Sequence, residues 1–259
     1  MNTAFDIASL DYDRVFTFSN IGKAQRRLVF KHLNARFLDT KLSILELNCG
    51  TGEDAIRLAK MGHQVLATDI SEGMIQVAKT KQYDRNCQFR TLDITSLSKA
   101  SFTNQFDVIF SNFGGFNCLS QKDIQTFFET ASSILVKNGR IILVIMPKNT
   151  LWERIYFSMK GQFKNAKRRN TTDSVSVNVE GKNVNTWYYN PNDIIPLASN
   201  FSLEKIKPIG IWIPPSYLQT SLLGKKVSLR ILSFLENCFS FTFFSKYADH
   251  YFIEFKKTS

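Results

Sequence analysis

One stretch of this 259-residue chain, Ser43–Ile70, limits the fold more than any other. Its first half is a short apolar run that ends in a turn of small residues, NCGTG at 48–52. The apolar spacing that follows predicts a helix, which Gly62 ends, and a second apolar run, 64–68, leads to Asp69. Two strands joined by such a helix are parallel, with a right-handed crossover. The stretch therefore predicts an α/β fold with a doubly wound, mostly parallel sheet.

Three chemical features meet where these two strands end: Glu46, the small-residue turn and Asp69. Open parallel sheets bind ligands outside the carboxyl ends of their strands. Gly50 and Gly52 let a ligand approach the backbone closely, and the helix after them presents free N–H groups. Asp69 stands 17 residues after Gly52, where a carboxylate can accept two hydrogen bonds from a ribose diol. The stretch predicts a site for an adenosine-type cofactor; the alternative is a structural turn that binds nothing.

The charges around the turn indicate which adenosine cofactor fits. Glu53 and Asp54 occupy the start of the helix, and two carboxylates there would repel the pyrophosphate of a dinucleotide. They suit a ligand with a cationic or neutral linker, and Glu46 would attract an ammonium group. S-adenosylmethionine carries both a sulfonium and an α-ammonium.

The segment ILELNCGTG, 44–52, resembles motif I of the class I S-adenosylmethionine-dependent methyltransferases. That motif has an acidic residue followed by Gly-x-Gly-x-Gly, and this chain has Asn48 in place of the first Gly. The resemblance covers Leu42–Met146 and implies a Rossmann-like fold. It also implies that Glu46 and the backbone of the turn hold the methionine moiety, and that Asp69 binds the ribose hydroxyls.

Five further positions are assigned to the cofactor by the same resemblance. Ile70 and Met74 match the apolar residues that flank the adenine, and Asp93 and Ile94 match the positions near the adenine amine. The N-terminal segment FDIASLDYD is similar to the lid of many small-molecule methyltransferases. That lid packs a tyrosine over the cofactor, and the matching residue here is Tyr12.

Three polar residues outside motif I are also candidates. Arg26, on a helix predicted at 23–38, could bind the cofactor carboxylate, or it could be a solvated surface charge. Asn112 follows the predicted strand 106–111 and could contact the cofactor or the substrate, or cap its own loop. Transfer from a sulfonium can proceed largely by positioning, so a general base is not required. If there is one, the candidate is His250, whose alternative is a purely structural role.

The order of elements predicts one domain with insertions. The expected parts are an N-terminal helical lid (1–41), a cofactor-binding core (42–147), a cap insertion with a β-hairpin and helices (148–190), the completion of the core (191–213 and 248–259) and a helical C-terminal insertion (214–247). Within the core, 201–213 predicts the sixth strand, and 250–255 predicts an antiparallel last strand at the edge of the sheet.

Composition limits the partners and the compartment only broadly. A formal net charge of +11 and a pI near 9.5 permit nucleic acid, anionic membranes or acidic substrates as partners. The four cysteines lack the spacing of a metal site or a disulfide framework, which indicates a reducing compartment and no metal. The N-terminal residues lack the apolar run of a signal peptide, so a cytoplasmic location is expected.

The segment Val227–Phe244 is rich in Leu, Ile and Phe, and Arg230, Glu236 and Asn237 interrupt it. These polar residues argue against a membrane-spanning helix. An amphipathic helix is expected instead. It would be buried in the core, close an apolar pocket, lie on a membrane surface, or form a dimer or other partner contact.

The interpretation that these features favour is methyl transfer to an O, N or C nucleophile of a small, apolar or aromatic metabolite. Methyl transfer to RNA or DNA is an alternative, in which the basic surface would bind phosphates. The loop SNFGGF at 111–116 lacks the Asn/Asp-Pro-Pro-aromatic motif that resembles base-amine methylation, so nucleic acid is not the expected partner. A non-catalytic binding protein on the same fold is the second alternative.

Overall fold

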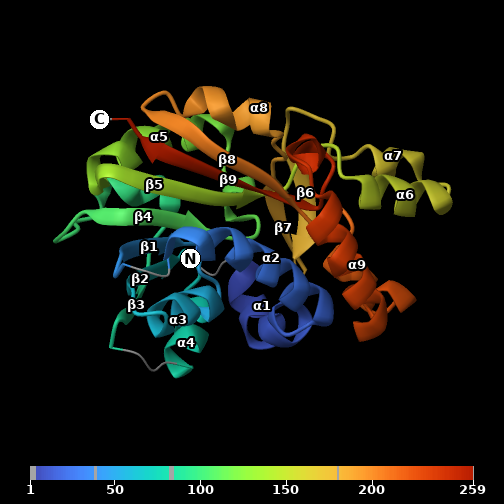
Figure 1. Cartoon of the computed structure of the whole chain (residues 1–259), viewed down its shortest axis with the longest axis horizontal. Helices are drawn as coiled ribbons and strands as arrows, with labels where there is room; N and C mark the ends of the chain where they lie inside the picture. Colours follow the sequence, from blue (N-terminus) through green and yellow to red (C-terminus); the bar gives the residue numbers. More distant parts are fainter. Residues whose placement is uncertain (1–3, 38–39, 82–84, 180, 259) are drawn as a thin grey trace.

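The computed structural model describes residues 4–37, 40–81, 85–179 and 181–258 (Figure 1). Among these residues, a seven-stranded sheet has the order β3-β2-β1-β4-β5-β9-β8. Its strands are β1 (Ser43–Leu47), β2 (Gln64–Asp69), β3 (Cys87–Thr91), β4 (Phe106–Ser111), β5 (Leu135–Ile145), β8 (Phe201–Ile209) and β9 (His250–Lys257). The strands from β3 to β5 are parallel, and β9 is antiparallel to both of its neighbours. The prediction of a doubly wound, mostly parallel sheet with an antiparallel last strand is confirmed.

The last strand does not lie where the sequence analysis placed it. β9 pairs with β5 on one side and with β8 on the other, so the expected edge position is wrong and β8 forms the edge. The burial of β9 explains the difference. Residues 251–255 are all buried, as in a strand covered on both faces, whereas 202–207 of β8 are at least partly exposed.

Helices cover both faces of the sheet and form two hydrophobic cores (Figure 1). Successive residues of β5 point to opposite faces, so Ile142 and Val144 join one core while Ile141 and Leu143 join the other. The first core is covered by α2 (Asn20–Phe37), α3 (Glu53–Lys60), α4 (Glu72–Thr80) and α9 (Lys226–Phe239). The second is covered by α5 (Gln121–Ile134), α8 (Pro191–Ile194) and η4 (Ile195–Leu197). Short helices η2 (Ile94–Lys99) and η3 (Gly115–Cys118) follow β3 and β4.

The N-terminal arm consists of α1 (Ala4–Tyr12) and the π-helical segment η1 (Asp13–Thr17), and it packs against the carboxyl edge of the sheet. Asp6 accepts hydrogen bonds from Ser71 Oγ (2.6 Å) and from Gly73 N (3.0 Å) at the start of α4. Asp13 accepts one from Thr51 Oγ1 (2.6 Å), in the turn after β1. The arm is therefore joined to both loops of the first βαβ unit.

Two groups of elements extend from the sheet beyond the carboxyl end of β5. The first is α6 (Leu151–Met159), α7 (Phe163–Ala166) and a separate hairpin of β6 (Val175–Val179) and β7 (Lys182–Thr186). The second is η5 (Ser216–Leu218), η6 (Leu222–Gly224), α9 and η7 (Thr242–Lys246). In Figure 1, α6, α7 and α9 project from the same end of the molecule. Among the described residues, no helix combines the length and the apolar character needed to cross a membrane.

One buried carboxylate joins α9 to the loop after β8. Glu236 accepts four backbone hydrogen bonds, from Gly210 N (3.0 Å) and Ile211 N (3.2 Å) on Oε1 and from Trp212 N (2.7 Å) and Ile213 N (3.2 Å) on Oε2. Four N–H groups pointing at one side chain form a concave site for negative charge. Glu236 thereby fixes the backbone that leads into the second group of elements.

Candidate active site

The turn after β1 needs glycine at specific points. Gly50 and Gly52 have φ angles of 54° and 78°, which favour glycine. A Cβ on Gly52 would lie 2.7 Å from the ring of Phe89 and 2.9 Å from Ala78 Cβ, so no larger residue fits there. The helix α3 begins directly after Gly52, and its first N–H groups face the edge of the sheet.

Asn48, which replaces a glycine of the motif, is accommodated by a glycine elsewhere. It has a positive φ of 49°, and its side chain lies against Gly115, where a Cβ would be only 2.0 Å from Asn48 Cγ. Its Nδ2 donates to Asn112 O (2.9 Å), and Ser111 Oγ donates to its Oδ1. Asn48 thus joins the ends of β1 and β4.

Glu46 is a buried carboxyl group with an unused acceptor. It is only 1% exposed, and its Oε2 has no hydrogen-bond partner among the described residues. Burial, with Asp54 nearby, raises the pKa of Glu46 well above its ordinary value. A buried oxygen of this kind can accept a hydrogen bond from an ammonium group, which would also supply the missing positive charge.

Asp69 shapes the turn and keeps capacity for a ligand. Its Oδ2 accepts a hydrogen bond from Gly50 N (2.8 Å) and its Oδ1 one from Ser71 N (2.9 Å). Burial raises the pKa of Asp69, and these backbone hydrogen bonds oppose the shift. Each carboxylate oxygen accepts two hydrogen bonds, so a ribose diol could still bind.

The predicted residues Arg26 and Asn112 meet at a residue that was not predicted to be in the site. Asp54 is 5% exposed and accepts hydrogen bonds from Arg26 Nε (2.7 Å) and from Asn112 Nδ2 (2.8 Å). Arg26 therefore balances the charge of Asp54 at the start of α3. Asn112 Oδ1 is buried without a hydrogen-bond partner among the described residues, which leaves it as an acceptor.

Two neighbouring cavities lie at this edge. The smaller, of about 40 Å³, is lined by Glu46, Asn48, Gly50, Asp54 and Asn112, among others. The larger, of about 240 Å³, is lined by Phe16, Gln25, Met146, Arg169, Tyr217, Asp249 and His250, among others. Tyr12, Arg26 and Phe113 line both cavities, so these three side chains stand between them.

The four residues assigned to the adenine do not line these two cavities. Ile70 is 48% exposed, whereas Met74 is buried in α4. Asp93 accepts a hydrogen bond from Thr95 N (2.9 Å) at the start of η2, which begins at Ile94. The structure thus groups six of the predicted cofactor-binding residues around the cavities: Tyr12, Arg26, Glu46, Asn48, Gly50 and Asn112. Gly52 and Asp69, like the adenine positions, do not line either cavity.

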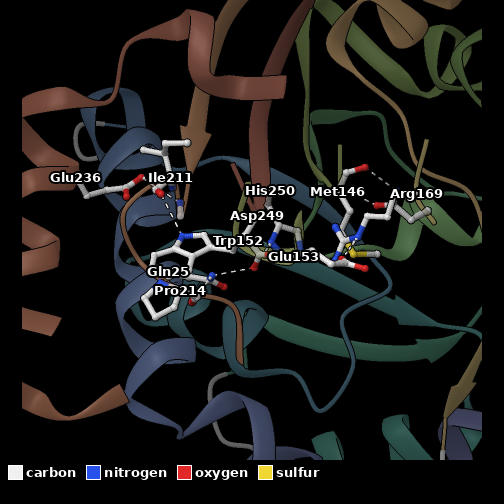
Figure 2. Close-up of polar contacts among 12 residues, drawn as sticks. Gln25, Met146, Trp152, Glu153, Arg169, Ile211, Pro214, Glu236, Asp249 and His250 are labelled. Carbon is white, nitrogen blue, oxygen red and sulfur yellow. Dashed lines mark hydrogen bonds and ion pairs between the residues drawn. The ribbon is translucent and has the colours of Figure 1, made fainter. Parts of the chain in front are cut away.

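The larger cavity contains a cluster of polar side chains, of which the sequence analysis predicted only His250. Figure 2 shows Gln25 and Asp249 pointing toward one another, with Gln25 Nε2 donating to Asp249 Oδ2 at 2.9 Å. Nδ1 of His250 lies 3.2 Å from the same oxygen, and its ring packs edge-on against Phe113. Burial alone would raise the pKa of Asp249, but His250, Arg169 and Gln25 lower it below its ordinary value.

His250 was a candidate from its type, but Gln25, Asp249 and Arg169 were not. They come from α2, from the residue before β9 and from the segment between α7 and β6, so no local pattern joins them. The available signal was the acid next to the histidine at 249–250.

A family model described as "Methyltransferase domain" matches residues 44–139. A malonyl-[acyl-carrier protein] O-methyltransferase of Bacillus cereus is 34% identical over 111 residues, covering 42% of this chain and 39% of that protein. A demethylmenaquinone methyltransferase of Paenarthrobacter aurescens is 28% identical over 158 residues, covering 60% of this chain and 58% of that protein. The chain therefore spans 39% of the length of the first relative and 58% of the second.

The fold is also found in solved structures. Magnesium protoporphyrin IX methyltransferase from Synechocystis PCC 6803, crystallised with bound SAH, superposes with a TM-score of 0.55 at 15% identity, covering 92% of this chain and 83% of that one. At this identity the likeness concerns the fold alone. The family match shows that residues 44–139, which include the Gly-rich turn at the end of β1, form a methyltransferase domain.

Proposed function

We propose that the chain binds S-adenosylmethionine at the small cavity and transfers its methyl group to a small molecule in the large one. The observation that carries this proposal is the buried Glu46, which lines the small cavity and whose Oε2 accepts no hydrogen bond from the described residues, so that it could accept one from the ammonium of the cofactor. Tyr12, Arg26 and Phe113 line both cavities, so the two ligands would be neighbours. This arrangement suits direct transfer between them.

The bound cofactor would supply an activated methyl group, and the residues of the chain would position it. Glu46 and the turn at 48–52 would hold the methionine moiety, and Asp69 the ribose. Asn112 Oδ1 would accept a further hydrogen bond near the methionine end. Met74 is buried, and Asp6 of α1 packs directly over the neighbouring Gly73. The adenine roles of Ile70, Met74, Asp93 and Ile94 stay predictions.

The large cavity favours an acceptor with an apolar or aromatic body. Its rings include Tyr12, Phe16, Phe113 and Tyr217, which can pack against such a body. His250 would act as the base where the nucleophile carries a proton. If the hydrogen of the neutral imidazole is on Nδ1, facing Asp249, then Nε2 is free to accept the proton of the nucleophile.

Calorimetric titration of the full chain with S-adenosylmethionine, S-adenosylhomocysteine and NAD tests the proposal. The first two should bind, and NAD should not. Glu46→Gln should weaken S-adenosylmethionine about tenfold or more, because a charge-assisted hydrogen bond is lost. Glu72→Gln, at the exposed start of α4, is the matched control and should bind normally. Binding of NAD without binding of either sulfur compound would show that the cofactor assignment is wrong.

We also propose that the exposed surface around α9 binds anionic lipid. Val227, Ile231 and Phe234 lie on one side of α9 and are 61–69% exposed, and Leu222, Phe241 and Phe243 nearby are 60–71% exposed. Exposed Lys225, Lys226 and Arg230 adjoin this apolar surface. An apolar stripe beside basic residues is typical of helices that lie in an anionic membrane surface.

Co-sedimentation with vesicles tests this second proposal. The protein should bind vesicles that contain phosphatidylglycerol and bind less to pure phosphatidylcholine. Ile231→Glu with Phe234→Glu should abolish binding, whereas Leu10→Glu, at a still more exposed apolar residue of α1, should not. A dimer in light scattering that the double variant dissociates, without any vesicle binding, would instead identify the surface as a contact between two copies.

A further inference from the structure

Arg169 is a buried cation in the wall of the large cavity. It follows α7 in a basic segment that also contains Lys164, Lys167 and Arg168, yet it is only 7% exposed while Lys164 and Lys167 are exposed. Arginine is rarely buried to this extent without partners that satisfy its five donors. Its surroundings therefore indicate what the cavity is built to hold.

The protein satisfies only part of this guanidinium. Nε lies 2.5 Å from Glu153 Oε2, and Cζ stacks 4.7 Å from the ring centre of Tyr188. Despite this ion pair, neither Nε nor Nη1 makes a hydrogen bond with the described residues. Figure 2 shows Arg169 and Glu153 side by side, next to Met146, which also lines the cavity. The guanidinium is thus held in place with a donor left over.

Arg169 shares both of the carboxylates near it, Glu153 and Asp249, with other groups. Glu153 is shared, because Arg168 Nε pairs with its other oxygen, so two arginines face one carboxylate. Of the other charged residues in the cavity wall, Arg26 is paired with Asp54, and Asp249 bonds to Gln25 and lies beside His250. A buried, unused guanidinium donor is unfavourable unless a ligand accepts from it.

We propose that Arg169 binds an anionic oxygen group, a carboxylate or a phosphate, on the methyl acceptor. This inference rests on the proposed function and narrows its substrate class to small anions with an apolar or aromatic body. The planar guanidinium suits such groups because it presents its donors in a fixed geometry. The anionic end of the acceptor would lie at Arg169 and its body between the rings of Phe113 and Tyr217.

Probe binding to the full chain tests this assignment. The probes are benzoate, phenyl phosphate, inorganic phosphate and the neutral benzyl alcohol, each titrated by calorimetry with S-adenosylhomocysteine present and absent. Benzoate or phenyl phosphate should bind, more tightly than inorganic phosphate, and benzyl alcohol should bind at least about tenfold more weakly. If benzoate binds more tightly than phenyl phosphate, the anionic group is a carboxylate, and the reverse order identifies a phosphate. Equal binding of the neutral probe would overturn the proposal.

Variants separate an anion contact from a structural role. Arg169→Gln should reduce the affinity for the anionic probe about tenfold or more, whereas Arg168→Gln, which removes a neighbouring charge bound to the same Glu153, should leave it nearly unchanged. If Arg169→Gln alone fails to fold, the double variant Arg169→Gln with Glu153→Gln removes the buried pair together. Undiminished probe binding in whichever variant folds would overturn the proposal.

Binding of S-adenosylhomocysteine distinguishes failure here from failure of the proposed function. Arg169→Gln should bind S-adenosylhomocysteine like the wild type, because Arg169 does not line the small cavity. Loss of anion binding with retained cofactor binding supports both proposals. An unmodified protein that binds the anions but not S-adenosylhomocysteine would reject the proposed function and leave the anion site standing.

Discussion

At the scale of single residues, Glu46 shows how a site can oppose the stability of the protein that contains it. Its carboxyl group is buried at the end of β1, and one of its oxygens has no hydrogen bond among the described residues. Ionising such a group without a partner is unfavourable, which is why its pKa is raised. The residue is well suited to a cationic ligand and poorly suited to the unliganded fold.

The sign of this effect gives a prediction for Glu46→Gln. The unfolded chain releases the Glu46 proton at an ordinary pKa, whereas the folded protein retains it to higher pH. The unliganded wild type should therefore lose stability as pH rises through that interval. The variant should be more stable than the wild type by about 1–3 kcal/mol at about pH 8, and the difference should shrink toward about pH 5.

Urea unfolding of both proteins across this pH range measures the difference. Glu72→Gln, at an exposed site, should follow the wild type. A wild type that is more stable than Glu46→Gln at the high end of the range would mean that a donor inside the protein already satisfies the carboxylate.

At the scale of elements, local sequence patterns predicted those elements whose structure depends on residues close together in the chain. The strand, turn and helix of the first βαβ unit were predicted because apolar spacing, glycines and an acidic strand end all lie within one stretch, Ser43–Ile70. The position of β9 could not be predicted in this way, because two partners far apart in the chain determine it. Its continuous burial over 251–255 was the available signal.

The residues of the candidate site also fall into those that a local pattern predicted and those that depend on distant parts of the chain. Glu46, Gly50 and Asp69 could be predicted as candidates because they lie within one stretch, Ser43–Ile70. Asn48 carried no sign that Gly115 would make room for it, and Asp54 appeared only as a charge at a helix start. Such contacts depend on how loops meet in space, which periodicity does not encode.

Glu236 allows a prediction about α9. Glu236→Gln keeps one acceptor oxygen but places an amide NH₂ group against two of the four backbone N–H groups. Its unfolding free energy should fall by about 2–3 kcal/mol, since hydrogen bonds to a charged group are lost and buried donors remain. Chemical denaturation measures the change. Glu129→Gln, on the exposed side of α5, should change the free energy by less than about 0.5 kcal/mol.

At the scale of the whole molecule, the two ends of the described chain contribute differently. The arm of α1 and η1 lies outside the sheet, whereas β9 lies between β5 and β8 and adds residues to both hydrophobic cores. Removing the arm exposes the edge of the sheet and its site. Removing β9 divides the sheet and leaves β8 without its hydrogen-bonding partner.

Two truncations test this asymmetry. A chain that begins at Asn20 should still unfold cooperatively, with weaker binding of S-adenosylmethionine because Tyr12 is gone. A chain that stops after Asp249 should not fold, because buried Tyr251, Phe252, Ile253 and Phe255 are missing. Circular dichroism during urea denaturation distinguishes the two. Cooperative unfolding of the shorter C-terminal variant would contradict the central role of β9.

The central position of β9 also determines when this molecule can fold during its synthesis. More than 100 residues separate β5 from the strand that pairs with it, and they leave the ribosome first. Until β9 emerges, one long edge of β5 is unpaired, and both hydrophobic cores lack the residues that β9 contributes. A nascent chain would therefore hold β5 with one edge open to non-native pairing, and Asp249 and His250 could join the rest of their cavity only once β9 has left the ribosome.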